Sequence, residues 1–149
     1  MLCTFCYSTT WLFFVAVVLS WVTAQVLKHF FSHTRLRAVD MFANSGGMPS
    51  AHTAATTAFV FMEYLLHGFT PLFVLTLLIL GIIITDARGV RYATGNNAKV
   101  LKHIIKDLHM KERVVVINGH TTKQVVYGAV VGFVVTSVLL ICVKLVGLL

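Results

Sequence analysis

The sequence predicts an all-α bundle of about four membrane-spanning helices, with one further amphipathic helix at the membrane surface. Hydrophobic residues make up 58% of the 149 residues and charged residues only 11%. A soluble domain of this size cannot bury so much apolar surface. The apolar residues are also gathered into four stretches that polar segments separate. At this length we expect a single domain that spans residues 1–149.

The four apolar stretches differ in length. Residues 11–31 and 125–149 each reach the roughly 20 residues that an α-helix needs to cross a bilayer. Residues 51–66 and 71–85 are shorter, and we expect them to form a helical hairpin that turns at residues 67–71. In the last stretch Gly128 and Gly132 form a GxxxG pattern, which favours close helix packing.

The basic residues indicate the orientation. Eleven of the twelve Lys and Arg residues lie in two segments, residues 28–47 and 86–123. Each costs roughly 2.5–3.5 kcal/mol at the bilayer centre, so the eight in residues 86–123 exclude a crossing there. Four crossings place both segments on one face, which the positive-inside rule makes cytoplasmic. We therefore expect an integral protein of a bacterial cytoplasmic membrane, with both termini outside.

The second basic segment contains an amphipathic pattern. Between residues 98 and 108, apolar residues repeat at helical spacing and basic residues occupy the other faces. This pattern is typical of a helix that lies on the membrane surface, and equally of a solvated linker helix. The net charge of +7 thus reflects topology, and we expect no nucleic-acid partner.

Three polar clusters fall at helix ends that the predicted topology brings to the same cytoplasmic face. They comprise residues 45–52, residues 86–91, which begin at Asp86, and residues 119–122. Singly, their members have structural explanations: Ser50 and Thr121 cap helices, and arginines anchor helix ends among headgroups. The convergence of three clusters on one face favours a functional site.

The residue types in these clusters suit a phosphate group. Two of the clusters precede helices, whose N-termini offer unpaired N–H groups and a positive dipole end. Arg88 and Arg91 carry forked donors that match phosphate oxygens. Three glycines allow the backbone to approach a ligand closely: Gly46, Gly47 and Gly119.

Two histidines in the clusters have side chains suited to phosphoryl chemistry. Imidazole can transfer protons or attack phosphorus near neutral pH, which predicts such roles for His52 and His120. A positive helix end disfavours imidazolium, which would keep a nucleophilic histidine neutral.

The ordered motifs GGMPSAH, DARGVR…ATG and GHTTKQVVYGAVVG resemble those of the divergent branch of the type 2 phosphatidic acid phosphatase superfamily. That branch is also labelled "acid phosphatase/vanadium-dependent haloperoxidase related". The resemblance runs from about Trp11 to the C-terminus and keeps the order and spacing of the motifs. It implies a helical membrane phosphatase that uses no cofactor.

The resemblance assigns roles to individual residues. His120 matches the nucleophile that forms a phosphohistidine, and His52 the general acid that protonates the leaving alcohol. Lys28 and Arg35 reproduce a K-x6-R spacing, although Leu36 replaces the family's proline. Arg88 and Arg91 belong to the divergent branch's own motif and would join Lys28, Arg35, Ser50 and Gly119 in phosphate binding.

Two positions depart from the family pattern. Gln124 stands where the superfamily has aspartate, or its divergent branch glutamate, four residues after the nucleophile. One helical turn joins positions 120 and 124, so the amide can orient the imidazole but supplies no charge. Val114 stands where the superfamily has an arginine, six residues before the nucleophile.

These observations predict a lipid-phosphate phosphatase. Its expected partners are a lipid phosphate substrate and membrane lipids, with a homo-oligomer as an open alternative. A second hypothesis is a non-catalytic relative that binds anionic lipids or assembles with partners, for which Gln124 is the best evidence. A third is a metal site at His29 and His33, one helical turn apart. The scarcity of carboxylates argues against this third hypothesis.

Overall fold

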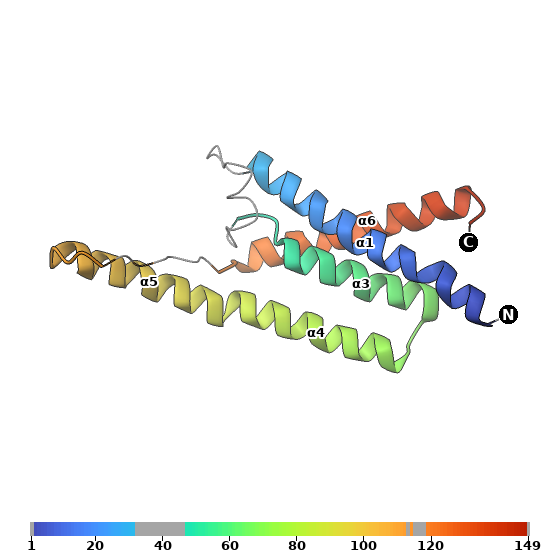
Figure 1. The fold of residues 1–149 in the computed structure, drawn as a ribbon, viewed down its shortest axis with the longest axis horizontal. Coiled ribbons are helices and arrows are strands. Elements are labelled where there is room, and N and C mark those ends of the chain that lie inside the picture. The colour runs from blue at the N-terminus through green and yellow to red at the C-terminus, as the bar shows by residue number, and fades with distance from the viewer. Residues whose placement is uncertain (1, 32–46, 113, 115–118, 149) are drawn as a thin grey trace.

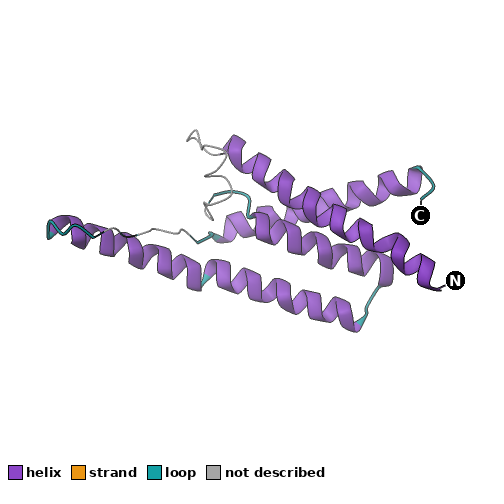
Figure 2. Ribbon diagram, in the orientation of Figure 1, coloured by secondary structure: helices purple, strands orange, loops and turns teal. Residues whose placement is uncertain are grey.

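The computed structural model describes residues 2–31, 47–112, 114 and 119–148, with side chains from Thr9 onward. Within these ranges the chain forms only helices and their connections (Figure 2). The helices are α1 (Leu2–Phe31), α3 (Ala51–His67), α4 (Pro71–Arg88), α5 (Val90–Asp107) and α6 (Thr122–Leu145). The predicted all-α membrane bundle is confirmed, and each predicted apolar stretch lies in a helix of its own.

Helix α3 is the centre of the bundle. The other three bundle helices, α1, α4 and α6, all pack against it. Figure 1 shows that chain direction alternates from α1 to α3, α4 and α6, so that the N- and C-termini lie at one end. The segments that carry the three polar clusters meet at the opposite end. The alternation is the arrangement that the predicted topology requires.

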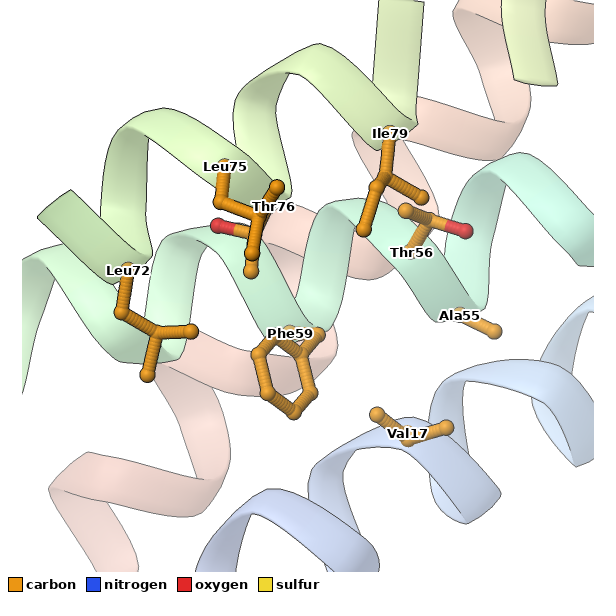
Figure 3. Close-up of a pocket in the computed structure, with 8 residues that line it drawn as sticks. All are labelled: Val17, Ala55, Thr56, Phe59, Leu72, Leu75, Thr76 and Ile79. Atoms are coloured by element: carbon orange, nitrogen blue, oxygen red, sulfur yellow. The ribbon is translucent and has the colours of Figure 1, made fainter. Parts of the chain in front are cut away.

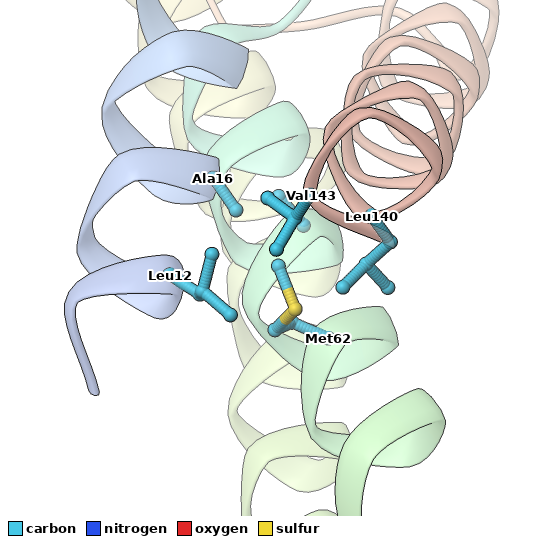
Figure 4. Close-up of a cluster of buried hydrophobic side chains, with 6 residues drawn as sticks. Leu12, Ala16, Met62, Leu140 and Val143 are labelled. Carbon is cyan, nitrogen blue, oxygen red and sulfur yellow. The ribbon is translucent and has the colours of Figure 1, made fainter. Parts of the chain in front are cut away.

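In α1, α3 and α6, buried residues recur at every fourth position, and in each helix they form the ridge that packs against its neighbours. Where ridges of this spacing interlock, helices cross at an angle, as α1 and α6 do in Figure 1. Near the end of the bundle that holds both termini, these ridges build an apolar core. Figure 4 shows its side chains from α1, α3 and α6 pointing toward one another: Leu12, Ala16, Met62, Leu140 and Val143.

The predicted GxxxG contact lies between α3 and α6. A Cβ on Gly128 would collide with the carbonyl oxygen of Ser50, and one on Gly132 with that of Ala54. One turn further on, Thr136 donates a hydrogen bond to the carbonyl of Ala58 at 3.4 Å. The absence of side chains at two successive turns thus lets the two backbones touch.

Substitution of Gly132 should therefore separate α3 from α6. We expect Gly132→Leu to destabilise the bundle by about 3 kcal/mol, at the upper end of overpacking effects, because the obstacle is backbone. Gly81→Leu is the matched control, since a Cβ there meets nothing within 4 Å. Thermal unfolding in detergent, followed by circular dichroism, measures both. Equal melting temperatures for the two variants would contradict the close contact.

The surface of the bundle is apolar, while small and polar residues occupy much of its interior. Phe14, Leu78, Ile82 and Ile141 are exposed, whereas Ser20, Ser50, Thr53 and Thr136 are fully buried. This pattern is typical of helices that pack within lipid, where burial of leucine against leucine gains little.

Three stretches of the described residues are long and apolar enough to cross a membrane by length and composition: Thr9–Phe31, Pro71–Asp107 and Thr122–Leu145. Helix α3, at 17 residues, is about 25 Å long, shorter than the ~30 Å hydrocarbon core. Its place at the centre of the bundle gives it protein neighbours along that length. Of the four predicted crossings, α3 is the one that does not reach the length of a membrane span by itself.

The predicted hairpin between α3 and α4 is confirmed, and it contains an acidic residue that the sequence analysis did not single out. Glu63 is 2% exposed. Its carboxylate lies 2.8 Å from His67 Nδ1 and accepts a 2.8 Å hydrogen bond from the Thr70 hydroxyl. Thr70 also caps α4, because its hydroxyl accepts from the N–H of Phe73. These contacts join the two helices across the turn and satisfy a buried carboxylate.

Helix α5 differs from its predicted arrangement. It begins at Val90 and runs on in nearly the direction of α4, beyond the end of the bundle (Figure 1). Of the two arrangements that we expected for the amphipathic pattern, this course is closer to the solvated linker helix than to a helix lying on the membrane surface. The reason is local: only Gly89 separates the two helices, and its N–H still bonds the carbonyl of Thr85 at 2.8 Å. Residues 86–91 therefore form the junction of two helices and not an open loop.

Candidate functional site

The site is built on the first turn of α6. Thr121 is the N-cap, and its side chain accepts the N–H of Gln124 at 3.4 Å. In return Gln124 Oε1 accepts the N–H of Thr121 at 2.9 Å. This reciprocal pair is a capping box, which satisfies two otherwise unpaired N–H groups of the helix start. The predicted cap at Thr121 is confirmed, and the side chain of Gln124 has a defined orientation.

That orientation determines which nitrogen of His120 carries a proton. His120 Nδ1 lies 3.3 Å from Gln124 Oε1. The Thr121 N–H can only donate, so the atom it meets is the amide oxygen, and Nδ1 must donate to the same oxygen. The neutral imidazole then has its lone pair on Nε2. An unprotonated Nε2 is the form that a nucleophile or base requires.

The surroundings of His120 keep the imidazole neutral. The residue is 6% exposed. Burial is the main cause that lowers its pKa below the ordinary 6.5. The hydrogen bond that Nδ1 donates to Gln124 raises the pKa, and the charges of Lys28, His52 and Arg91 lower it. Burial thus acts in the same direction as the helix dipole, from which we expected a neutral imidazole. The same charges show that side chains from α1, α3 and α5 lie near His120.

A cavity of about 300 Å³ opens beside His120. Its lining comes from the end of α4, the start of α5 and the start of α6: Arg88, Tyr92, His120, Thr121 and Thr122. The backbone N–H of His120 donates to the carbonyl of Ala87 at 3.0 Å, which holds the start of α6 against the end of α4. A guanidinium and an imidazole thus border a polar space at a helix N-terminus, as in anion sites.

The start of α3 is attached to the same turn of α6. Ser50, whose side chain caps α3 as predicted, donates its backbone N–H to the carbonyl of Gln124 at 3.0 Å. The next residue but one, His52, is exposed. A direct backbone hydrogen bond therefore joins the first polar cluster to the first turn of α6, which follows the third cluster directly. The second cluster joins them through the bond between His120 and Ala87.

Lys28, which the resemblance assigns to phosphate binding, is buried beneath the first cluster. It is 5% exposed, and its aliphatic chain runs against Gly47, where a Cβ would lie 2.7 Å from Lys28 Cε. Gly47 has a φ of 110°, in the region that favours glycine. The lysine is covered because the glycine offers no side chain to displace it.

Arg91 and Asp86 form an ion pair across the junction of α4 and α5, in which the guanidinium Nε donates to the carboxylate. Both side chains remain partly exposed. Asp86 therefore orients Arg91, and it also competes for the donors that Arg91 could offer a phosphate. Of Arg88 and Arg91, only Arg88 lines the cavity.

Two predicted site residues, Arg35 and Gly46, lie outside the described residues. The same is true of His33, one of the two histidines proposed as metal ligands. Among the described residues, no group of three or more His, Cys, Asp or Glu side chains is placed to hold a metal ion.

Sequence reasoning missed the role of Tyr92. It lines the cavity beside Arg88, and its backbone lies so close to Gly119 that a Cβ there would collide with Tyr92 N. Residues 88 and 92 are one helical turn apart, so their spacing could have indicated a shared face. We placed residues 86–91 at a helix end and began the next helical pattern only at residue 98, so this spacing was not considered. Gly119, which we expected to approach a ligand, makes its close approach to the start of α5.

These features define a class: a helical membrane protein with a buried neutral histidine and an arginine beside a polar cavity at one end of the bundle. The chain belongs to the divergent PAP2 family, whose model matches residues 10–135. It is also similar to the uncharacterized membrane protein YuiD of Bacillus subtilis (strain 168), with 28% identity over 137 residues that cover 79% of this chain and 87% of YuiD. No solved structure matches the chain. The resemblance seen in the sequence motifs is thereby confirmed.

Proposed function

We propose that this protein is a membrane-embedded lipid-phosphate phosphatase that acts through a phosphohistidine on His120. The supporting observation is the state of that side chain: it is buried, neutral, oriented by Gln124, and beside a cavity that Arg88 lines. A phosphoric monoester at the headgroup level suits this site, because its tail can stay in the bilayer. Phosphatidylglycerophosphate, phosphatidate and polyprenyl phosphates belong to this substrate class.

The proposed reaction has two steps. In the first, the lone pair of His120 Nε2 attacks phosphorus, the bond from phosphorus to the ester oxygen breaks, and His52 gives its proton to the leaving alcohol. In the second, His52 takes a proton from water, the resulting hydroxide attacks phosphorus, and the phosphorus–nitrogen bond breaks. The step releases inorganic phosphate and returns both histidines to their starting forms.

Positive groups would stabilise the charge on the transferring phosphoryl group. Arg88 offers forked donors from the cavity wall, and Arg91 and Lys28 add positive charge nearby. The buried position of Lys28 suits it to a role in the local potential more than to direct contact. Arg35, Ser50, Gly119, Gly46 and Gly47 remain predicted contributors to phosphate binding or backbone geometry.

Phosphate release from lipid phosphates tests the proposal. The purified protein in detergent should release inorganic phosphate from at least one of the three substrate types, and should do so equally in the presence of EDTA. Activity that EDTA abolishes would support a metal site instead. Binding of the same lipids to the intact protein without any phosphate release would contradict the phosphatase.

A second candidate function is a non-catalytic protein that binds anionic lipids. Two observations favour it: the neutral Gln124 beside His120, and the ion pair in which Asp86 engages Arg91. A binding protein would retain affinity for phosphatidate vesicles in His120→Ala, because Arg88 and the helix N-terminus are still present. A phosphatase would lose turnover in the same variant.

The proposed orientation places the site on the cytoplasmic face and both termini outside. A cysteine at Lys106, on α5, should therefore react with an impermeant reagent only from the cytoplasmic side. A cysteine at Phe69, which is 81% exposed in the turn between α3 and α4, should react only from outside. The native cysteines are first replaced by serine. Reaction of both positions from the same side would contradict the topology.

A further inference from the structure

An apolar groove runs along α3 between α1 and α4 (Figure 3). Its volume is about 430 Å³. Val17 on α1 forms one wall, Ala55, Thr56 and Phe59 on α3 form the floor, and α4 supplies the other wall, whose residues are Leu72, Leu75, Thr76 and Ile79. The groove is open to the surroundings of the bundle, since Leu72 and Leu75 are about half exposed.

The floor of the groove lies on the same face of α3 as His52. Positions 52, 55, 56 and 59 follow the spacing that places helix residues on one face. The end of the groove at Thr56 is one turn from His52, and the Thr56 hydroxyl donates to the carbonyl of His52 at 2.8 Å. His52 thus stands at the head of the groove.

The groove runs along the bundle axis. Its α4 wall extends from Leu72 to Ile79, a rise of about 10 Å along the helix. The helices α1 and α4, which form its two walls, lie in stretches long and apolar enough to span the bilayer, so the groove has the direction of a lipid hydrocarbon chain. The end of the groove at Thr56 and Ile79 lies toward the cationic groups around His120. The rest of the groove, toward Leu72, is lined mainly by apolar side chains. A cationic end above an apolar channel is complementary to a phosphate that carries a hydrocarbon chain.

We propose that this groove binds one hydrocarbon chain of the lipid phosphate, and that it is the chain-length selector of the site. The proposal rests on the proposed function and agrees with its chemistry. His52 is the group that protonates the leaving alcohol, and that alcohol carries the hydrocarbon. A groove that begins one turn below His52 is where the chain of the leaving group would enter. Burial of each methylene there contributes to binding by the hydrophobic effect.

Two adjacent valines on α1 provide a matched test. Val17 lines the groove, whereas Val18 is exposed elsewhere on the helix. We expect Val17→Phe to lower kcat/KM for dioleoyl phosphatidate at least tenfold and for dihexanoyl phosphatidate less than twofold. Val18→Phe should leave both values unchanged. Equal losses on the two substrates, or equal effects of the two variants, would overturn the groove as a chain site.

A second measurement does not depend on turnover. A phosphatidate with a photoreactive diazirine in its acyl chain is incorporated with the wild-type protein and irradiated, and the labelled peptides are identified by mass spectrometry. Labelling confined to residues 55–59 and 72–79 supports the groove, even if the wild type releases no phosphate and the phosphatase proposal fails. Labelling spread evenly over α4 and α6 overturns the groove, even if phosphate release is observed.

Discussion

His120→Ala is expected to abolish phosphate release, by about 10³-fold or more. The covalent route needs a nucleophile at this position, and without it only binding and electrostatic stabilisation remain. The variant should still fold, because the contact that attaches this residue to α4 is its backbone N–H to the carbonyl of Ala87. Initial rates on phosphatidate in detergent, compared with the wild type, measure the loss.

His103→Ala is the matched control for that variant. His103 is exposed on α5. Its replacement tests whether the loss of a histidine outside the cavity also lowers the rate. We expect wild-type rates. A wild-type rate in His120→Ala would show that the nucleophile lies elsewhere. So would a radiolabelled phosphoenzyme that still forms in this variant and survives an alkaline denaturing quench, which preserves phosphohistidine.

The helices of the bundle were predictable because lipid simplifies the pattern. A long apolar run such as residues 11–31 has few alternatives to a helix when the backbone must satisfy its own hydrogen bonds. The GxxxG at Gly128 and Gly132 likewise predicted a close contact between helices. The spacing alone did not identify α3 as the partner helix. The course of α5 was not predictable, since Gly89 is compatible both with a turn and with a continuing helix.

The site was predictable as a set of residue types but not as a geometry. The three clusters were expected on one face, and direct backbone bonds from Ser50 and His120 join them. The burial of Lys28 depends on its fit against Gly47, which brings a residue of α1 against the segment that precedes α3. Only one of the two contacts of Gln124, with His120 and with Thr121, could be predicted from the sequence. Sequence spacing showed that it reaches His120, but its bond to Thr121 required the capping geometry.

That capping geometry allows the charge at position 124 to be changed without loss of structure. Glutamate is an ordinary capping-box residue at this position of a helix, so Gln124→Glu should keep the bond from the Thr121 N–H and the proton on His120 Nδ1. What it adds is a negative charge beside the imidazole. An imidazolium or phosphohistidine that forms during the reaction would then have a charged partner.

We expect Gln124→Glu to raise turnover roughly 10- to 100-fold. The corresponding amide in a serine-protease triad costs about 10⁴ in rate, but there it also enforces the wrong tautomer. Here the capping box already provides the right tautomer, so only the charge is missing. Because the carboxylate raises the pKa of His120, which burial holds below 6.5 in the wild type, the acidic limb of the kcat/KM profile should move to higher pH. The rates are therefore compared on the plateau above that limb. A folded variant with an unchanged rate and profile would show that position 124 does not limit catalysis, and background release in both proteins would favour the lipid-binding function.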